Sequence, residues 1–251
     1  MSDKISCREG VYQGGWKVAI EYLPQAGVKY VELGDYEKAE LVSVAGACRE
    51  KGVTPLTIAG GVDCDKPESV NRVKAECEAA KAVGVQYYFL SAHGKDRAAA
   101  MKTLAGLGAF AAKCGVTLCL ETHPPFCLNA DEMRKTINEV NHPNVRINFD
   151  TANVMYYNEG LHSAEELEKI IDVVASMHMK DTDGGFHSLN FPVLGKGVVD
   201  FSRVIRILHD ANFAGPLTLE LEGPIIDKLD LAGRHEAVKA CVEHLGKYAK
   251  L

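Results

Sequence analysis

The stretch GVTLCLETHPPFCLNADEMRKTINEVNHPNVRINFD, residues 115–150, contains one full unit of the pattern that decides the fold. Gly115 is followed at once by an apolar run that ends in Glu121, then by a helical stretch, and then by a second apolar run that ends in Asp150. Glycine just past a helix end adopts the left-handed conformation without steric cost. The stretch therefore predicts a strand, a helix and a second strand parallel to the first.

The same junction recurs along the chain. Gly27, Gly52 and Gly84 are each followed directly by valine, as Gly115 is, at the spacing of one strand–helix unit. The pattern predicts strands near 4–8, 29–34, 54–60, 86–92, 116–122, 145–150, 176–180 and 217–222. It predicts helices near 16–26, 37–51, 67–82, 96–113, 130–139, 163–174, 200–210 and 231–249.

Eight such units in 251 residues predict one closed (β/α)8 barrel, a TIM barrel, as a single domain over residues 1–251. An open, doubly wound sheet is the competing fold. No Gly-x-Gly-x-x-Gly follows the first predicted strand, which removes the simplest dinucleotide-binding interpretation.

Four of the apolar runs carry a metal-ligand side chain near their C-terminal ends. They are VTLCLE at 116–121, VRINFD at 145–150, SMHMK at 176–180 and PLTLELE at 216–222. Strands alternate side-chain direction at every residue, so Glu121, Asp150, His178 and Glu220 all share the polar face of their strands. That face lines a barrel interior, and active sites lie at the C-terminal strand ends. Any one of these side chains could cap a helix, but their agreement favours one shared site.

Three carboxylates and one imidazole form a mixed oxygen and nitrogen ligand set. The sequence therefore predicts one divalent metal ion, with Mn²⁺ favoured and Co²⁺, Mg²⁺ or Zn²⁺ as alternatives. Glu222 also points inward, so either Glu220 or Glu222 could be the fourth ligand.

Several motifs resemble one known family. They are LETH at 120–123, DTAN at 150–153, HMKD at 178–181, LGKGVVDF at 194–201 and LTLELEG at 217–223. In order and content they resemble the xylose isomerase-like TIM barrels of the AP endonuclease family 2 superfamily, and within them the sugar phosphate isomerase/epimerase group. The resemblance covers essentially the whole chain.

The resemblance implies the barrel, a divalent metal and the ligands Glu121, Asp150, His178 and Glu220. It favours Glu220 over Glu222, which is then left to support the site or face the substrate. Asn153 stands where many relatives carry histidine. We therefore expect substrate orientation to differ here, or a second metal to be absent.

Two further residues are candidates for catalysis. Lys180 follows His178 on the inward face, where a lysine can hold a substrate oxygen or act as an acid. His123 lies two residues beyond Glu121, as an acid/base or substrate group or as an ordinary loop histidine.

Three more residues are candidates for substrate contact. His93 ends the fourth strand, and Lys196 lies in a Gly-Lys-Gly turn suited to a phosphate or hydroxyl. His187 lies in the long irregular stretch 181–199, which we expect to be a lid or clamp rather than a plain connection. Glu32 is another inward carboxylate, expected to be structural, with Arg8 or Arg146 as its partner.

This set predicts an isomerase or epimerase of a keto sugar, sugar phosphate or related polyol. The metal would polarise the carbonyl, and Glu121 and Glu220, on different strands, would move a proton through an enediolate. The alternative is a lyase or dehydratase, like the inosose dehydratases on this scaffold, since an enolate can also expel a β-hydroxyl group. A non-catalytic sugar-binding barrel is a further alternative.

Composition narrows the partners. Lys+Arg 28 against Asp+Glu 34 gives a net charge of −6, which disfavours a DNA-repair nuclease, as does Asn153 where such a nuclease needs a histidine ligand. Eight cysteines without a C-x-x-C pair indicate free thiols in a reducing cytoplasm. No signal peptide or membrane span is evident. We expect a cytoplasmic protein that binds a small carbohydrate, neither nucleic acid nor membrane, and that could form a homo-oligomer.

Overall fold

The glycine–valine junctions end helices as the sequence predicts. In the computed structural model, which describes residues 2–250, Gly27, Gly52, Gly84 and Gly115 have φ of 77°, 76°, 72° and 72°. After Gly115 the chain turns so tightly that the Val116 amide still donates to Ala111 O at 3.0 Å. The left-handed Gly115 thus ends the helix, and the next strand begins two residues later, at Thr117.

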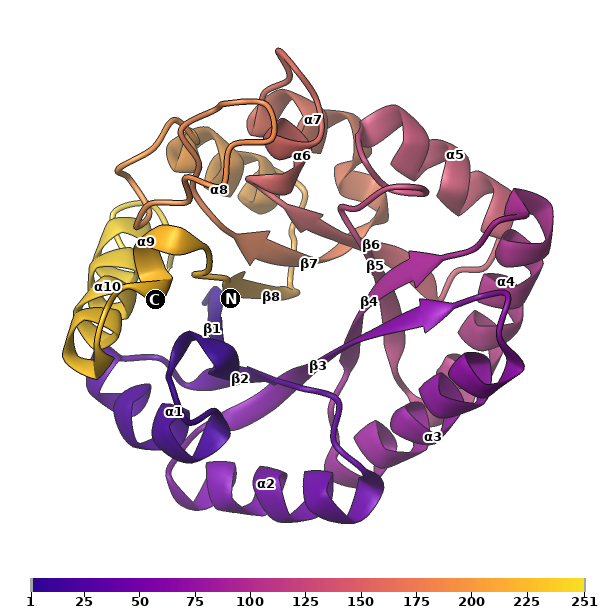
Figure 1. The fold of residues 1–251 in the computed structure, drawn as a ribbon, viewed down its shortest axis with the longest axis horizontal. Coiled ribbons are helices and arrows are strands. Elements are labelled where there is room, and N and C mark those ends of the chain that lie inside the picture. The colour runs from indigo at the N-terminus through magenta and orange to yellow at the C-terminus, as the bar shows by residue number, and fades with distance from the viewer. Residues whose placement is uncertain (1, 251) are drawn as a thin grey trace.

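The strands pair in parallel and in sequence order to form one closed barrel, which confirms the predicted TIM barrel (Figure 1). They are β1 (Lys4–Arg8), β2 (Tyr30–Leu33), β3 (Thr54–Asp63), β4 (Tyr87–His93), β5 (Thr117–Glu121), β6 (Val145–Asp150), β7 (Val174–Met179) and β8 (Pro216–Leu219). β1 pairs with both β2 and β8, so the first and last strands close the ring.

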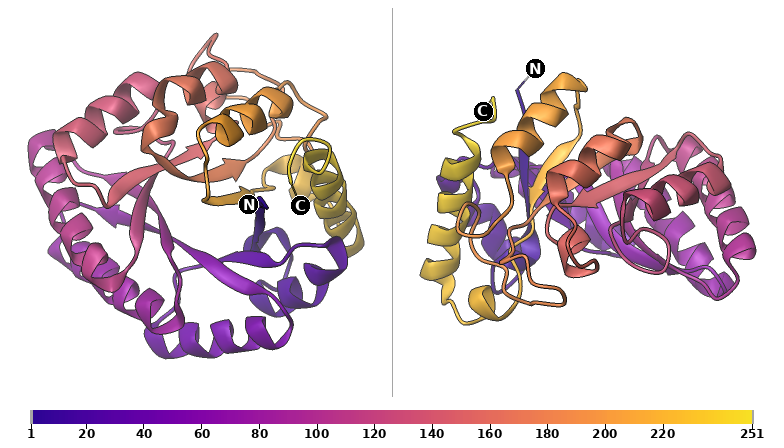
Figure 2. Two further views of the ribbon diagram at one scale, coloured as in Figure 1. Left: turned by 180° about the vertical axis from the view of Figure 1, so that it is seen from behind. Right: turned by 90° about the horizontal axis from the view of Figure 1, so that it is seen from above.

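Helices surround the barrel (Figures 1 and 2). The α-helices are α1 (Trp16–Tyr22), α2 (Lys38–Glu50), α3 (Pro67–Val83), α4 (Arg97–Cys114), α5 (Ala130–Val140), α6 (Asn153–Tyr156), α7 (Ser163–Ile170), α8 (Phe201–Asp210), α9 (Pro224–Asp227) and α10 (Leu231–Leu245). Short 3-10 turns are η1 (Glu9–Val11), η2 (Pro24–Ala26) and η3 (Ile171–Val173). Among residues 2–250, no helix has both the length and the apolar character needed to cross a membrane.

The predicted strand faces are also confirmed. The apolar residues of the site-bearing strands are all buried: Leu118, Leu120, Ile147, Phe149, Met177, Met179, Leu217 and Leu219. Each such side chain contributes about 1.5–3 kcal/mol by leaving water. All eight belong to one hydrophobic cluster with buried helix residues such as Leu104 and Val204, so this face packs outward against the helices and the alternate residues face the barrel axis.

The differences from the predicted boundaries have local causes. Pro24 cannot extend α1, so the predicted helix 16–26 divides into α1 and η2. The predicted helix 163–174 ends at Ile170 and is followed by the turn η3. The strand β7 then begins at Val174, two residues before the predicted start at 176. β8 ends at Leu219, the last residue that pairs with both neighbouring strands. The one-turn helices α6 and α9 were not predicted because four residues carry no periodicity.

Candidate metal centre

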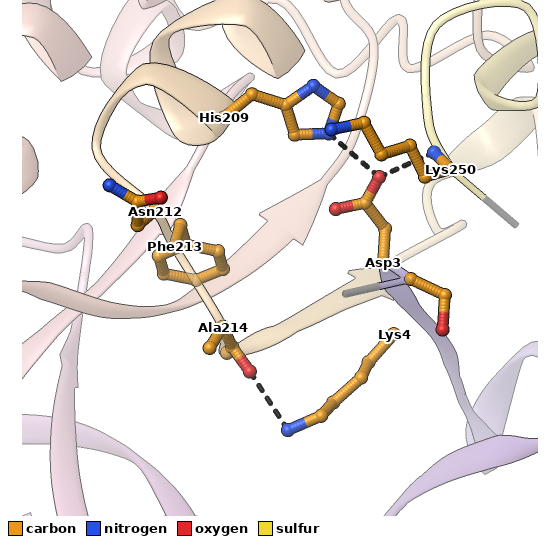
Figure 3. Close-up of a pocket in the computed structure, with 9 residues that line it drawn as sticks. Asp3, Lys4, His209, Asn212, Phe213, Ala214 and Lys250 are labelled. Carbon is orange, nitrogen blue, oxygen red and sulfur yellow. Dashed lines mark hydrogen bonds and ion pairs between the residues drawn. The ribbon is translucent and has the colours of Figure 1, made fainter.

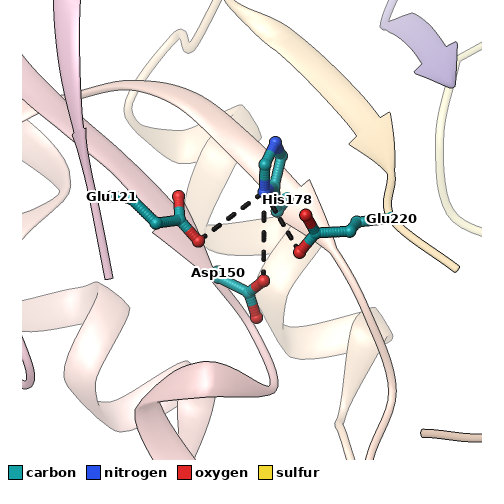
Figure 4. A group of neighbouring side chains, drawn as sticks. All are labelled: Glu121, Asp150, His178 and Glu220. Atoms are coloured by element: carbon teal, nitrogen blue, oxygen red, sulfur yellow. Dashed lines mark ion pairs between the residues drawn. The ribbon is translucent and has the colours of Figure 1, made fainter. Parts of the chain in front are cut away.

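Four side chains converge at the C-terminal end of the barrel. Glu121 and Asp150 are the last residues of β5 and β6, His178 is the next-to-last residue of β7, and Glu220 follows β8 directly. Each offers one ligand atom, and all four atoms lie within 4.8 Å of one another. Figure 4 shows the side chains pointing toward a common centre. The sequence prediction that these residues come together is therefore confirmed, and Glu222 is not part of the group.

The group has the properties of a cation site. His178 Nδ1 lies 3.3 Å from Glu220 Oε2 and 3.6 Å from Glu121 Oε1, with Asp150 Oδ2 at 4.0 Å. His178 is 0% exposed, yet its Nδ1 has no hydrogen-bond partner among residues 2–250. A buried nitrogen without a partner, among three carboxylates, is costly unless something positive lies between them. The oxygen and nitrogen donors suit a single divalent ion.

The other ring nitrogen of His178, Nε2, is held by Glu32. Both carboxylate oxygens of Glu32 lie 3.2 Å from Nε2. A carboxylate in that place fixes the imidazole so that Nδ1 faces a metal. Arg8 Nε lies 3.2 Å from Glu32 Oε1, so Arg8, not Arg146, is the partner of Glu32. Arg146 donates instead to the backbone oxygen of Asp172.

Glu121 is held by neutral amides. Asn148 Nδ2 donates to Oε2, and Asn153 Nδ2 donates to Oε1 at 3.3 Å. Asn148 is itself oriented by Ser176 Oγ, which donates to Oδ1 at 2.6 Å. Asp150 Oδ1 accepts the Ala152 and Asn153 amides, each at 2.7 Å, which leaves Oδ2 for the centre.

Glu220 is held by cations instead. Arg8 Nη1 donates to Oε1, and Lys180 Nζ lies 2.7 Å from Oε2. The same ammonium group lies 2.8 Å from Glu222 Oε1 and 3.0 Å from Asp150 Oδ2. Lys180 is 2% exposed, whereas the Glu222 side chain is 49% exposed. Lys180 therefore adjoins the group from its outer side, and Glu222 lies at the mouth.

The charges shift the titration of the group. Burial opposes the charge on His178, but Glu220, Glu32 and Glu121 outweigh it and raise the pKa of the imidazole well above its ordinary value. Burial raises the pKa of Asp150. For Glu220, burial acts in the same direction, but His178, Lys180 and Arg8 together hold its pKa well below the usual range. Neighbouring carboxylates thus differ in the charge that surrounds them.

His123 and Asn153 also reach the Glu121 side of the centre. His123 Nε2 lies 3.4 Å from Asn153 Nδ2, and Nδ1 lies 3.3 Å from Ser91 Oγ. The Tyr157 ring packs edge-on against the imidazole, with centroids 5.4 Å apart. Burial lowers the pKa of His123, so its ring is neutral at ordinary pH. The structure therefore joins both predicted residues to Glu121.

The remaining candidates lie farther out. His93 is the exposed last residue of β4 and shares the strand face of Phe89 and Ser91. His187 is exposed, has φ of 53°, and packs on Phe186 and Tyr156 with ring centroids 4.0 Å and 5.1 Å away. No contact joins either histidine to the ligand group within residues 2–250.

Lys196 lies in a turn that is held by contacts of its neighbouring residues. The amides on either side of it, from Gly195 and Gly197, donate to Asp181 Oδ2 at 2.8 Å and 2.9 Å. Leu194 N lies 3.4 Å from Cys241 Sγ, so this turn packs against α10 on the outside of the barrel. The amides that could have met a phosphate are thus satisfied by a carboxylate of the chain itself.

Sequence reasoning missed some residues of the site. The sequence suggests Arg8 only as a possible partner of Glu32, and it predicts no role for Asn148. Their position on the polar strand face was the available signal.

A hollow lies at the end of the barrel opposite to the ligand group, where β1 and β8 begin. Asp3, Lys4, His209 and Lys250 line a cavity of about 130 Å³ there (Figure 3). Asp3 Oδ2 is shared between His209 Nε2 at 2.9 Å and the Lys250 amide at 2.7 Å. These contacts connect the segments at the two ends of the described chain.

Comparison with known proteins gives a family and a fold. The family model described as "Xylose isomerase-like TIM barrel" matches residues 20–248. An inosose dehydratase from Histophilus somni (strain 129Pt) is 28% identical over 133 residues, which cover 46% of this chain and 44% of that protein. The match thus spans less than half the length of the curated relative.

Solved structures agree along the whole chain. D-psicose 3-epimerase with D-tagatose, from Clostridium cellulolyticum H10, gives a TM-score of 0.81 at 14% identity and covers 99% of this chain and 100% of that chain. The IOLI protein with a binding zinc atom gives a TM-score of 0.78 at 20% identity, with 99% and 100% covered. At these identities the likeness shows the fold.

Proposed function

The chain belongs to the xylose isomerase-like TIM barrel family, and we propose that it is a metal-dependent isomerase or epimerase of a keto sugar or related polyol. One observation carries the proposal: Glu121 and Glu220, from different strands, approach the same buried centre, which His178 and Asp150 complete. The D-psicose 3-epimerase that shares the fold supports a carbohydrate substrate.

Glu121, Asp150, His178 and Glu220 would hold one divalent ion, for which Mn²⁺ is our first choice and Co²⁺, Mg²⁺ or Zn²⁺ the alternatives. The zinc atom in the IOLI structure supports such an ion. When bound, the ion would supply Lewis-acid polarisation of a substrate carbonyl.

The two glutamates would divide the proton transfer. One carboxylate takes the proton from the carbon next to the carbonyl, which leaves an enediolate of the substrate, and the other returns a proton. Return to the opposite face of the same carbon gives an epimer, whereas return to the former carbonyl carbon gives an aldose. Their contacts favour a fixed arrangement, since each is held by two further side chains.

The surrounding residues would orient the substrate. Lys180 is buried beside Glu220 and could hold or protonate a substrate oxygen. His123 and Asn153 present neutral hydrogen-bonding groups beside Glu121. Glu222 lies at the mouth. His93 and His187 are exposed and would contact the outer part of the substrate.

Elimination is the second candidate. The inosose dehydratase relative supports it, because loss of water from a keto-polyol begins with the same proton abstraction. Such a reaction needs an acid for the departing hydroxyl group. Lys180, 3.0 Å from Asp150 and 2.7 Å from Glu220, is the cation placed to provide it.

Proton NMR in D₂O tests these candidates together. The Mn²⁺- or Mg²⁺-loaded protein would be incubated with free ketoses, ketose phosphates and cyclic keto-polyols. Loss of a C–H signal next to the carbonyl, with an epimer or aldose appearing, is the expected result. A vinylic signal would assign elimination instead. Silence across the panel, with one bound metal confirmed, would contradict both and favour a non-catalytic sugar-binding barrel.

A further inference from the structure

Arg8 joins two carboxylates that belong to different strands. It is the last residue of β1, it lies opposite Glu32 in the β1–β2 register, and β1 also borders β8, which Glu220 follows. Nη1 donates to Glu220 Oε1, and Nε lies 3.2 Å from Glu32 Oε1. A planar guanidinium can satisfy two carboxylates at once in fixed directions.

Both carboxylates lead to the metal centre. Glu220 offers Oε2 to the centre, 3.3 Å from His178 Nδ1, while Arg8 occupies the other oxygen. Glu32 holds His178 through Nε2 with both oxygens at 3.2 Å. One guanidinium therefore contacts one of the four ligands directly and a second one through Glu32.

Phe89 completes the support around His178. Its ring lies 4.6 Å from the imidazole, and the Arg8 guanidinium lies 5.5 Å from the same ring. The histidine is thus fixed at one ring face by Phe89 and at its edge by Glu32, and Arg8 contacts both of these residues.

Lys180 differs from Arg8 in which oxygen it contacts. Lys180 Nζ lies 2.7 Å from Glu220 Oε2, the oxygen that a bound ion would need. Arg8 donates to Oε1 and does not compete for that oxygen. Of the two cations on Glu220, Arg8 is the one that leaves Oε2 free for a bound ion.

We propose that Arg8 is a positioning residue that presents Glu220 and, through Glu32, His178 to the divalent ion. The proposal rests on the metal site of the proposed function. The change in metal affinity that it predicts on removal of Arg8 is opposite in sign to the change expected from charge repulsion alone. A positive charge near a bound cation weakens its binding. If Arg8 were only a bystander, the protein without it would therefore bind the metal more tightly. If Arg8 positions the ligands, the protein without it would bind the metal more weakly.

Titration calorimetry of the metal-free, full-length protein with Mn²⁺ decides between the two. For Arg8→Met we expect the Kd to rise about tenfold to a hundredfold, as for other residues that support metal ligands. Arg146→Met is the matched control, because Arg146 is also an inward-facing arginine but donates to the Asp172 backbone at the other end of the barrel. Its Kd should equal that of the wild type.

Visible absorption of bound Co²⁺ gives a second readout, since its bands report coordination number and geometry. Arg8→Met frees Glu220 Oε1, so the bands should shift, whereas those of Arg146→Met should match the wild type. If Arg8→Met does not fold, Arg8→Lys replaces it, because lysine keeps the charge but cannot bridge both carboxylates. We expect its Kd to rise severalfold.

Equal or tighter Mn²⁺ binding by the folded Arg8 variants would overturn the positioning role. Failure of the wild type to bind Mn²⁺, Co²⁺ or Zn²⁺ would instead refute the metal site of the proposed function. The two failures are therefore distinguishable.

Discussion

Glu121 and Glu220 are the same residue type on two sides of one centre, but their surroundings differ. On the β5–β6 side, Glu121 accepts from the neutral amides of Asn148 and Asn153. On the β8–β1 side, Glu220 contacts two cations, Arg8 and Lys180. Equivalent geometry thus does not mean equivalent chemistry. A carboxylate among cations is fixed in its charged form, whereas one among amides is oriented without a countercharge.

The most severe test of this comparison removes each carboxylate in turn. Glu121→Gln and Glu220→Gln keep the shape of the side chain but cannot take up a proton. We expect both to lower kcat by about 10²- to 10⁴-fold, the usual contribution of a general acid or base. Turnover would be followed by NMR and bound metal by elemental analysis. Glu121→Gln with metal bound and full turnover would remove Glu121 from the proton transfer.

The same pair of variants should separate in stability. Glu220→Gln leaves Arg8 and Lys180 without their shared carboxylate, and breaking such a pair is strongly destabilising. We expect a loss of about 3 kcal/mol in the free energy of unfolding, at the low end for buried pairs because the Arg8 side chain is 33% exposed and both cations keep another carboxylate partner.

Glu121→Gln exchanges hydrogen bonds to neutral amides and should change stability by about 1 kcal/mol or less. Urea unfolding in the presence of a chelator measures both variants without the contribution of metal binding. Equal losses in the two variants would show that the cations do not distinguish the two sides.

A smaller effect is expected from the amide side. Asn153→Ala removes the hydrogen bond to Glu121 Oε1 and the contact with His123 Nε2. The cost of one hydrogen bond to a charged group, about 1.5 kcal/mol, corresponds to roughly a tenfold lower kcat/KM. Steady-state kinetics at saturating metal tests this, with metal content as the control. No change would mean that Asn153 does not orient Glu121 during turnover.

The smallest effect concerns pH. Burial lowers the pKa of His123, so the imidazole remains neutral as the pH falls through its ordinary value. His123 should therefore not produce the acidic limb of the kcat/KM profile. We expect His123→Gln to lower kcat/KM without moving that limb. A limb that disappears in the variant would show that His123 gains its proton near neutral pH.

Much of the fold and the ligand group could be predicted because the signals are local. Gly115 indicates a helix end. The alternation of side chains along each strand places Glu121, Asp150 and His178 on the inward faces of their strands before any tertiary contact is known. A parallel barrel brings the C-terminal strand ends together. Four local predictions therefore combined into one group of side chains that the structure brings together.

The supporting contacts depend on long-range pairing that no local pattern reveals. Arg8 meets Glu220 across 212 residues because β8 closes against β1. Lys196 is expected near a substrate from its Gly-Lys-Gly turn alone, whereas the contacts of that turn, its amides with Asp181 and Leu194 with Cys241 of α10, come from distant parts of the chain. A loop conformation of this kind depends on which internal carboxylate meets the amides in the folded chain, and no local pattern reveals that.

Anomalous diffraction from crystals grown with Mn²⁺ tests the central claim most directly. We predict one manganese peak among Glu121, Asp150, His178 and Glu220, bound by His178 through Nδ1 and by Glu220 through Oε2, with Arg8 still on Oε1. A peak elsewhere, or none at a concentration that saturates calorimetric binding, would contradict the account.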